Sequence, residues 1–250
     1  MTLIGRTEMT SMRGPRSIRE IGRIGRVVAL AVVFTIVVPA GMLATPAFQA
    51  AAPRDFTRWE KDVAAFEAAD RTSPPPKDGI LFVGSSTIVR WKTLQQDFAG
   101  KPVINRGFGG NTIADSTHFA DRMIVPYRPR MIFLRAGGND IHNGQTPEQV
   151  FQDFKDFVAT VHAKLPKTEI LFISLAPSIA RWDERDASKK LNALVAAHVK
   201  TDRRLKYIET YDTTLDANGQ PRPDLFAEDK LHFSPEGYKL LIEKVRPFVR

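Results

Sequence analysis

The chain contains no cysteine among its 250 residues. This absence excludes disulfide bonds, thiolate nucleophiles and cysteine-ligated zinc sites, but it does not decide the compartment. The hydrophobic fraction of 43% and the charged fraction of 26% are ordinary for a soluble globular protein. The length therefore fits one domain of ordinary size, with a core that can stand alone, plus a targeting segment.

The sequence also lacks the signatures of nucleotide and nucleic-acid binding. The glycine-rich stretch 107–110 matches neither the dinucleotide motif G-x-G-x-x-G nor the phosphate loop G-x-x-x-x-G-K-[ST]. The net charge is +8, but residues 1–50 hold six arginines and two glutamates, which leaves 30 basic and 26 acidic residues in the remainder. A balance of +4 over that remainder, without a basic stripe carrying interleaved aromatics, predicts no nucleic-acid partner.

Residues 1–50 have the three parts of a secretory signal peptide. Five arginines between positions 13 and 26 precede the apolar run Val27–Val38, and a tail of small residues follows through Ala52. This order predicts cleavage and export, to the periplasm or the outside. The alternative is an uncleaved anchor helix over Val27–Leu43, which is short for a membrane span and contains Pro39. In that case we expect a membrane contact through this N-terminal segment.

Residues 51–76 predict an N-terminal helix and a stiff linker. Apolar residues at helical spacing, among them Phe56, Trp59 and Phe66, indicate an amphipathic helix over Asp55–Asp70. We expect its aromatic side chains to pack on the body of the protein. Three prolines at 74–76 then form the linker, and residues 77–250 are expected to form the main domain.

Five apolar runs in the main domain alternate with helical patterns. The expected strands are 80–83, 103–105, 131–135, 169–175 and 207–208, and the last is followed by a final helix. This alternation predicts an α/β fold, a doubly wound, mostly parallel five-stranded sheet with helices on both faces. In such sheets ligands bind at the carboxyl ends of the strands.

Two serines follow the first buried strand. Gly84 ends the strand and allows a tight turn, and Ser85 and Ser86 come where a helix would begin. At this place the field of the helix N-terminus favours developing negative charge, which makes Ser86 a candidate nucleophile. The alternative is that the two serines only cap the helix.

Polar or glycine-rich turns also follow the second and third strands. Three glycines within 107–110 allow backbone N–H groups to approach a ligand. Asn139 follows the third strand, and its amide can donate a hydrogen bond without carrying charge. The alternatives are a plain glycine-rich turn and, for Asn139 or Asp140, an Asx turn or a helix cap.

Asp229 and His232 lie just ahead of the last helix, which we expect Ser234 to cap with Pro235 in the first turn. At this spacing in a turn, the carboxylate can accept a bond from one imidazole nitrogen and leave the other free, as a general base requires. The alternative is a surface Asp and His that merely flank a helix. Taken together, the four clusters hold what acyl transfer requires: a nucleophile, a base, an orienting acid and oxyanion donors.

Here the sequence resembles a known family, the SGNH hydrolase superfamily of GDSL-type esterases and lipases, over about residues 79–250. The four matching blocks, in the order of the family, are Phe82–Thr87, Asn105–Thr112, Gly137–Asp140 and Asp229–His232. One departure is Ser85, which stands where the family usually has an aspartate. Serine at that place resembles the platelet-activating-factor acetylhydrolase-like branch, and the Gly-x-Ser register favours Ser86 over Ser85 as the nucleophile.

The resemblance implies a flavodoxin-like three-layer sandwich and a role for each matching residue. Ser86 would be the nucleophile, His232 the base and Asp229 the residue that orients it. The oxyanion hole would consist of the backbone N–H of Ser86, the N–H of Gly110 and the side chain of Asn139. The implied activity is that of a serine esterase working through an acyl-enzyme, which needs no metal and no organic cofactor.

The substrate is expected to be a small-molecule, glycan or lipid ester with a short acyl chain, because no long apolar cap insertion is present. Acetyl groups on polysaccharide are the first expectation. The alternatives within the superfamily are a lysophospholipase and a thioesterase. A non-catalytic exported protein that binds glycans through Trp91 and Trp182 is the alternative from another class, and the presence of all four catalytic residue types argues against it.

Overall fold

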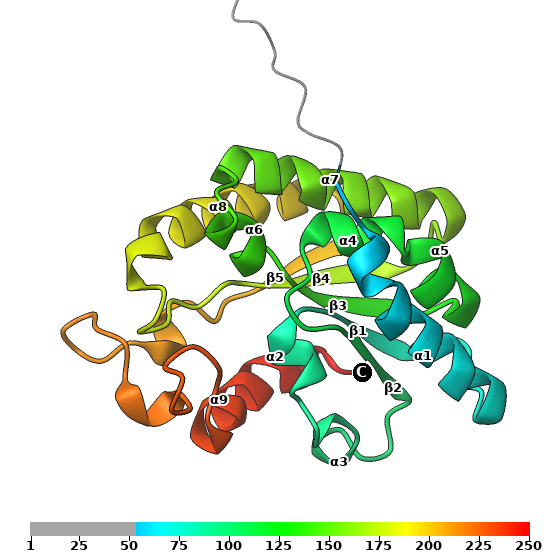
Figure 1. The fold of residues 1–250 in the computed structure, drawn as a ribbon, viewed down its shortest axis with the longest axis horizontal. Helices are drawn as coiled ribbons and strands as arrows, with labels where there is room; N and C mark the ends of the chain where they lie inside the picture. The colour runs from blue at the N-terminus through cyan, green and yellow to red at the C-terminus, as the bar shows by residue number, and fades with distance from the viewer. Residues whose placement is uncertain (1–53) are drawn as a thin grey trace, which may run out of the picture. The chain divides into compact units, whose positions relative to one another are not determined.

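A computed structural model describes residues 54–250, which contain one five-stranded sheet (Figure 1). The strands are β1 Ile80–Gly84, β2 Val103–Gly107, β3 Met131–Arg135, β4 Glu169–Ile173 and β5 Leu205–Ile208. They lie in the order β2-β1-β3-β4-β5, and every neighbouring pair is parallel. The predicted α/β fold is therefore confirmed, whereas the signal peptide predicted for residues 1–50 lies outside the described residues.

Helices cover both faces of the sheet (Figure 1). One core cluster joins the sheet to α1 Glu60–Thr72, α4 Ile113–His118, α5 Ala120–Met123, α7 Pro147–Lys164 and α8 Arg185–His198. The opposite cluster joins it to α2 Ser86–Val89, α3 Leu94–Asp97 and α9 Pro235–Val245. The remaining helix, α6 Gly138–His142, follows the carboxyl end of β3.

The central strands β1 and β3 are buried on both faces, which explains their continuous apolar runs, whereas the edge strand β5 is partly exposed at Lys206 and Tyr207. In β1, Leu81 and Val83 belong to the first cluster, while Ile80 and Phe82 belong to the second. Phe82 stacks on Phe133 of the neighbouring strand, with ring centroids 4.6 Å apart. The two cores hold the strand ends rigidly, and the functional loops start from those ends.

Several element boundaries differ from the predictions. The predicted helix over Asp55–Asp70 starts as a 3-10 turn at Thr57, because the Asp55 carboxylate accepts from the Thr57 N–H, and α1 itself begins at Glu60. The strand predicted over residues 169–175 ends at Ile173, because the backbone of Leu175 bonds to the side chain of Asn192. The short helices α4 and α5 were not predicted, since neither is long enough to show a helical period.

Trp91 corrects one of the alternatives. Its side chain is only 2% exposed, packs against Phe82 and Tyr238, and donates its indole N–H to Asp97 at 2.7 Å. A sugar cannot stack on this buried ring, so the proposed role of Trp91 in glycan binding is wrong. Trp182 is half-buried beneath the guanidinium of Arg185.

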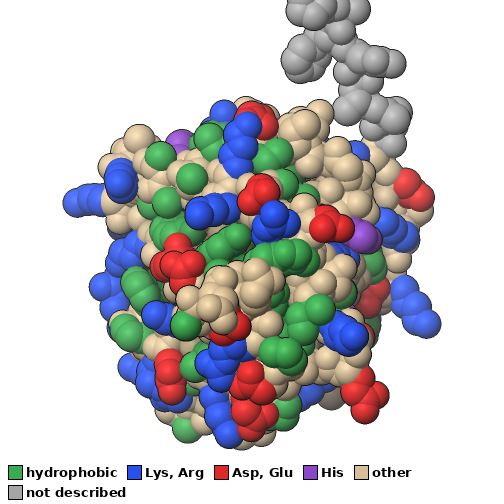
Figure 2. Space-filling view, turned by 90° about the vertical axis from the view of Figure 1, so that its left-hand side faces the viewer, with side chains coloured by type: hydrophobic (Ala, Val, Ile, Leu, Met, Phe, Trp, Pro, Cys, Tyr) green, Lys and Arg blue, Asp and Glu red, His purple; other side chains and the backbone are tan. Residues whose placement is uncertain are grey.

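The surface carries charges of both signs. Figure 2 shows basic, acidic and hydrophobic side chains interleaved on the face that it presents. Within residues 54–250, no helix combines the length and the apolar character that crossing a bilayer requires.

Candidate active site

The turn after β1 places Ser86 at the carboxyl end of the sheet. Gly84 has a φ of 149°, and a Cβ at this position would lie 2.1 Å from the carbonyl oxygen of Arg135. Only glycine allows β1 to pass so close to β3. The Ser85 N–H then donates to the same Arg135 oxygen at 3.1 Å, and α2 begins at Ser86. The sequence thus forces a sharp turn directly before the predicted nucleophile.

The two serines do not serve as helix caps. The N-terminus of α2 has no side-chain cap hydrogen bond, although Ser85 occupies the N-cap position. Both serines instead line a cavity of about 420 Å³. The side chain of Ser86 is half-buried, so its hydroxyl is shielded by protein yet accessible from the cavity.

The glycine-rich turn after β2 is fixed against α2. Asn105 donates from Nδ2 to the Ile88 carbonyl at 2.6 Å and accepts from the Gly107 N–H at 2.9 Å. A Cβ at Gly107 would lie 2.5 Å from the Val89 nitrogen, so glycine is required for this close packing. The chain then reaches Gly110, which has a φ of 79° and lines the cavity. Asn105 belongs to the second matching block, but the sequence alone does not reveal that its side chain ties β2 to α2.

The amide of Asn139 is held by hydrogen bonds on both sides. Nδ2 donates to the Asn111 carbonyl at 3.0 Å, and Oδ1 accepts from Arg181 Nη1 at 3.1 Å. These partners fix which end of the amide is the donor, and the second N–H of Nδ2 stays available. Sequence reasoning missed Arg181, because it lies in a loop 42 residues further along the chain with no motif around it.

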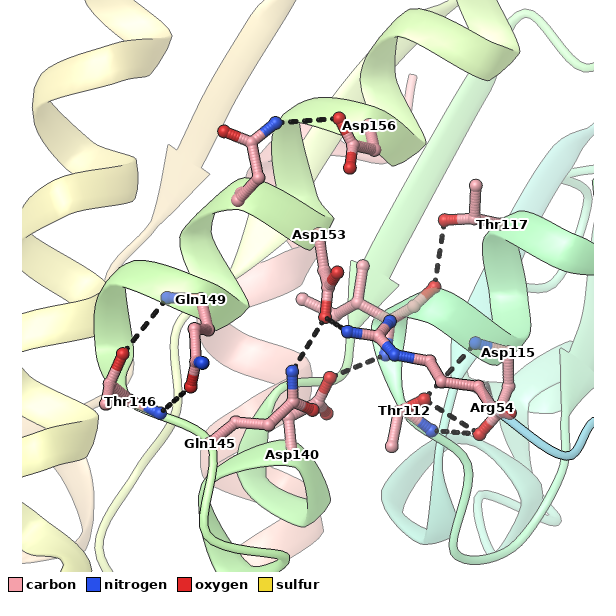
Figure 3. Close-up of polar contacts among 12 residues, drawn as sticks. Arg54, Thr112, Asp115, Thr117, Asp140, Gln145, Thr146, Gln149, Asp153 and Asp156 are labelled. Atoms are coloured by element: carbon pink, nitrogen blue, oxygen red, sulfur yellow. Dashed lines mark hydrogen bonds and ion pairs between the residues drawn. The ribbon is translucent and has the colours of Figure 1, made fainter. Parts of the chain in front are cut away.

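Asp140 has a structural place beside this site. It is fully buried, and its Oδ1 accepts from the backbone N–H of Ile113 at 3.0 Å, so it caps the start of α4 from another helix (Figure 3). The alternative of a cap on its own helix does not hold, since the N-cap of α6 is Gly137 and no side chain caps that helix. Oδ2 is buried without a hydrogen-bond partner among the described residues. Burial, with added repulsion from Asp153 and Asp115, raises the pKa of Asp140 to about 7.

Asp229 and His232 form a pair in the loop before α9. Asp229 Oδ1 accepts from the backbone N–H groups of Leu231 and His232, and Oδ2 lies 2.6 Å from His232 Nδ1. The N–H and the ring of His232, followed by the N–H of Leu231, hold the pKa of Asp229 well below its usual range. The carboxylate is therefore ionised at neutral pH and fixes the imidazole with Nε2 as the remaining nitrogen.

The helix that follows keeps this loop in place. Ser234 accepts from the Gly237 N–H at 3.2 Å, which confirms the predicted cap of α9, and it donates to the Asp224 carbonyl at 2.7 Å. Phe226 and Phe233 pair across the loop in an antiparallel bridge. The position of His232 is thus determined by a capped helix and a paired backbone.

The cavity brings the predicted residues together. Its lining includes Ser86, Gly110, Asn139 and His232, while Asp229 lies behind His232 and bonds to it. The structure shows no hydrogen bond between Ser86 Oγ and His232, a bond that often tightens only when substrate is bound. The lining of this one cavity offers a hydroxyl, an oriented imidazole and N–H donors, as acyl transfer requires.

Other titratable groups form no second centre of this kind within residues 54–250. His142, on α6, bonds to Glu184 at 2.6 Å, and its side chain is 54% exposed. No cluster of three or more histidine, aspartate or glutamate side chains among these residues could hold a metal ion.

Comparison with known proteins gives a match to one family and matches to several solved structures. The model of the GDSL-like Lipase/Acylhydrolase family matches residues 82–240. A search of curated proteins finds no significant match. Among solved structures, one described as a platelet activating factor from Streptococcus pneumonia has a TM-score of 0.68 at 20% identity, covering 77% of this chain and 94% of its own.

Two further structures have the same fold. One described as an acylhydrolase from Bacteroides fragilis has a TM-score of 0.65 at 19% identity and covers 75% of this chain and 96% of its own. An acetylxylan esterase from Geobacillus stearothermophilus has a TM-score of 0.56 at 14% identity, with coverages of 68% and 94%. At these identities the likeness shows the fold alone. Because the family model spans well over half of the chain and contains all four motif blocks, the protein belongs to the GDSL-like lipase/acylhydrolase family and is an ester-hydrolysing enzyme.

Proposed function

We propose that the protein is a serine esterase in which Ser86 is the nucleophile, His232 the general base and Asp229 the orienting acid. One observation carries this proposal. Asp229 lies 2.6 Å from His232 Nδ1, which leaves Nε2 of the ring without a partner in the pair. The ring lines the same cavity as Ser86, whose hydroxyl caps no helix. A positioned imidazole beside a hydroxyl is the arrangement that activates a serine.

In the proposed reaction, His232 Nε2 takes the proton of Ser86 Oγ as the oxygen attacks the ester carbonyl. The negative charge that develops on the carbonyl oxygen is held by the N–H of Ser86, the N–H of Gly110 and the amide of Asn139. The protonated His232 gives its proton to the leaving alcohol, and the acyl-enzyme remains. Water, activated by the same imidazole, then releases the acid.

Among the described residues, the backbone N–H groups assigned to this oxyanion hole have no hydrogen-bond partner, and Asn139 Nδ2 keeps one N–H beyond the one that it donates to the Asn111 carbonyl. Ser86 is the first residue of α2, where the backbone N–H has no partner within the helix. Gly110 is an exposed turn residue with a φ of 79°. The Asn139 amide is oriented by Arg181, so its donor end is fixed before substrate arrives. Such preorganised donors are usually the largest single contribution to catalysis of this kind.

The size of the cavity supports a short acyl chain as the substrate group. About 420 Å³ lies at the lower end of the range for small-molecule sites. Its lining mixes apolar side chains such as Leu175 and Phe226 with polar ones. The Geobacillus protein that shares this fold is an acetylxylan esterase. Acetylated carbohydrate is therefore the first class of natural substrate to assay.

Export is proposed on the sequence of residues 1–50 alone. If the signal peptide is cleaved, the mature protein will be found outside the cytoplasm and will begin within the small-residue tail, at about residue 51. Cell fractionation with N-terminal sequencing tests this. A full-length chain in the membrane fraction would favour the anchor over Val27–Leu43.

The activity is tested with p-nitrophenyl esters of increasing acyl length. We expect turnover by the wild type and by Ser85→Ala, and a loss of kcat on the order of 10⁶-fold in Ser86→Ala. The acetylxylan esterase exists as a catalytic mutant in which a serine is replaced by alanine, which supports the choice of variant. Loss of activity in Ser85→Ala alone would identify Ser85, rather than Ser86, as the nucleophile. Activity that survives both substitutions would refute the mechanism.

A further inference from the structure

Two buried arginines in the sheet differ in how their charge is compensated. Arg106, on β2, is 9% exposed, and all three of its nitrogens have partners: Nε donates to Tyr127 at 2.7 Å, Nη1 to the Asn105 carbonyl, and Nη2 to the carboxylate of Asp70. This is the usual arrangement, since a buried charge is costly unless it is paired and hydrogen-bonded.

Arg135, the last residue of β3, is more deeply buried and has no such compensation. It is 6% exposed, and Nη1 alone is bonded, to the Ser174 carbonyl and to Thr210 Oγ1 at 3.3 Å. Its guanidinium lies over the ring of Phe233, 5.3 Å from the centroid. Among the residues that the structure describes, no carboxylate pairs with it.

Arg135 lines the catalytic cavity, and two of its nitrogens are neither bonded nor fully enclosed. The fully enclosed side-chain polar atoms without a partner in residues 54–250 are Trp59 Nε1, Asn111 Oδ1 and Asp140 Oδ2. Nε and Nη2 of Arg135 are not among them, although no described residue accepts a bond from either. Arg135 lines the cavity, so a group that enters it meets this residue while these two nitrogens have no partner.

The cavity supplies little negative charge for this guanidinium. Of the acidic residues at the site, Glu184 is bonded to His142, and Asp229 is bonded to His232. Arg181 adds positive charge to the same lining, and Arg90, which also lines it, lies 3.8 Å from Asp229 Oδ2, so this carboxylate has a second partner. Burial lowers the pKa of Arg135 to about 10, so it still carries its charge at neutral pH. A guanidinium held in this way is a binding group for an anion that enters the cavity.

We propose that Arg135 binds a carboxylate of the substrate, so that the ester cleaved at Ser86 is anionic. The proposal rests on the proposed esterase function and names its substrate class. The edge formed by Nε and Nη2 is the face of a guanidinium that takes a carboxylate with two parallel hydrogen bonds. The backbone oxygen of Arg135 accepts from the Ser85 N–H at 3.1 Å, so the backbone of this residue is bonded to the turn that presents the nucleophile.

Two pairs of esters show whether the carboxylate bound by Arg135 lies on the acyl side or on the alcohol side of the substrate. The p-nitrophenyl ester of succinic acid, with a free carboxylate on the acyl side, is compared with that of levulinic acid, which has a neutral acetyl group in its place. On the alcohol side, 4-acetoxybenzoate is compared with its methyl ester. The measured quantity is the ratio of kcat/KM for the charged and the neutral ester of each pair.

In one pair we expect Arg135→Met to lower this ratio at least about tenfold, the size of a lost charge-assisted hydrogen bond. The pair that responds shows which side of the ester carries the carboxylate. Arg106→Met is the matched control, because it removes another buried arginine of the sheet that lies outside the cavity lining, and its ratios should equal those of the wild type. Ratios that are the same in the wild type and Arg135→Met for both pairs would overturn the proposal.

A binding measurement separates this proposal from the esterase function. Succinate or 4-hydroxybenzoate should raise the Tm of the wild type and Arg106→Met, but not that of Arg135→Met. If no ester is hydrolysed but this stabilisation is seen, only the esterase function fails. If Arg135→Met does not fold, Arg135→Lys replaces it. Lysine cannot donate two parallel hydrogen bonds to a carboxylate, so Arg135→Lys should lower the ratio of kcat/KM for the charged and the neutral ester, but by less than Arg135→Met would. Stabilisation by inorganic phosphate but by neither carboxylate would contradict the assignment.

Discussion

Asp140 allows a quantitative prediction about stability. Its carboxyl is fully buried, with one oxygen bonded to the Ile113 N–H and the other without a described partner (Figure 3). Its pKa rises from 3.8 to about 7 in the folded chain, first because of burial and then because of nearby carboxylates. A shift of about three pH units corresponds to about 4 kcal/mol, at about 1.4 kcal/mol for each unit.

The raised pKa of Asp140 makes the folded chain less stable at high pH than at low pH. The folded chain binds the Asp140 proton more tightly than the unfolded chain does, so the stabilising contribution is complete below about pH 3.8. It is lost as the pH rises through about 7. In Asp140→Asn the side chain stays neutral and still offers an oxygen to the Ile113 N–H. The free energy of unfolding of the variant, relative to the wild type, should therefore increase by up to about 4 kcal/mol between pH 4 and pH 8.

The measurement is urea unfolding of both proteins at several pH values across this range. Any fixed cost of the new amide N–H group shifts the whole curve and does not change its slope with pH. Asp156→Asn is the matched control, because this exposed carboxylate on α7 is bonded only to Gln152 among the described side chains. Its curve should stay parallel to that of the wild type. If the Asp140→Asn curve is parallel as well, the carboxyl is not neutralised by burial and the reasoning is wrong.

Three further predictions concern the site itself. Asn139→Ala should lower kcat by about 10²–10³-fold with little change in KM, measured on a short-chain p-nitrophenyl ester, because one oxyanion donor is lost. Asp229→Asn should lower kcat by about 10⁴-fold in the same assay while circular dichroism stays unchanged, because the imidazole of His232 loses its orienting anion. Gly84→Ala should fail to give soluble, folded protein, because its Cβ would lie 2.1 Å from the Arg135 oxygen; a normal Tm would contradict this.

The fold could be predicted because its strands carry strong local signals. A run such as Ile80–Val83 is apolar on both faces, and the structure buries every residue in it. The motif residues were also predictable as a set, since parallel strands end at one edge and bring Ser86, Gly110 and Asn139 to one cavity. Spacing alone placed Asp229 and His232 within bonding distance, because both lie in one short turn.

What the sequence did not reveal depends on contacts between distant segments. Arg181 reaches Asn139 from a loop, and no local pattern marks such a contact. Arg135 is the last residue of an otherwise apolar strand. Its hydrogen-bond partners, the Ser174 carbonyl directly after β4 and Thr210, come from distant parts of the chain. The burial of Trp91 likewise depends on distant segments, because its ring packs against Phe82 of β1 and Tyr238 of α9.

The identity of the nucleophile is the central claim, and trapping the covalent intermediate tests it most directly. The protein is incubated with a fluorophosphonate that reacts with activated serines, digested, and the modified peptide is sequenced by mass spectrometry. We predict one label on Ser86, and no label in Ser86→Ala or in His232→Ala, since the hydroxyl needs its base. A label on Ser85, or labelling of Ser86 that does not depend on His232, would contradict the proposed mechanism.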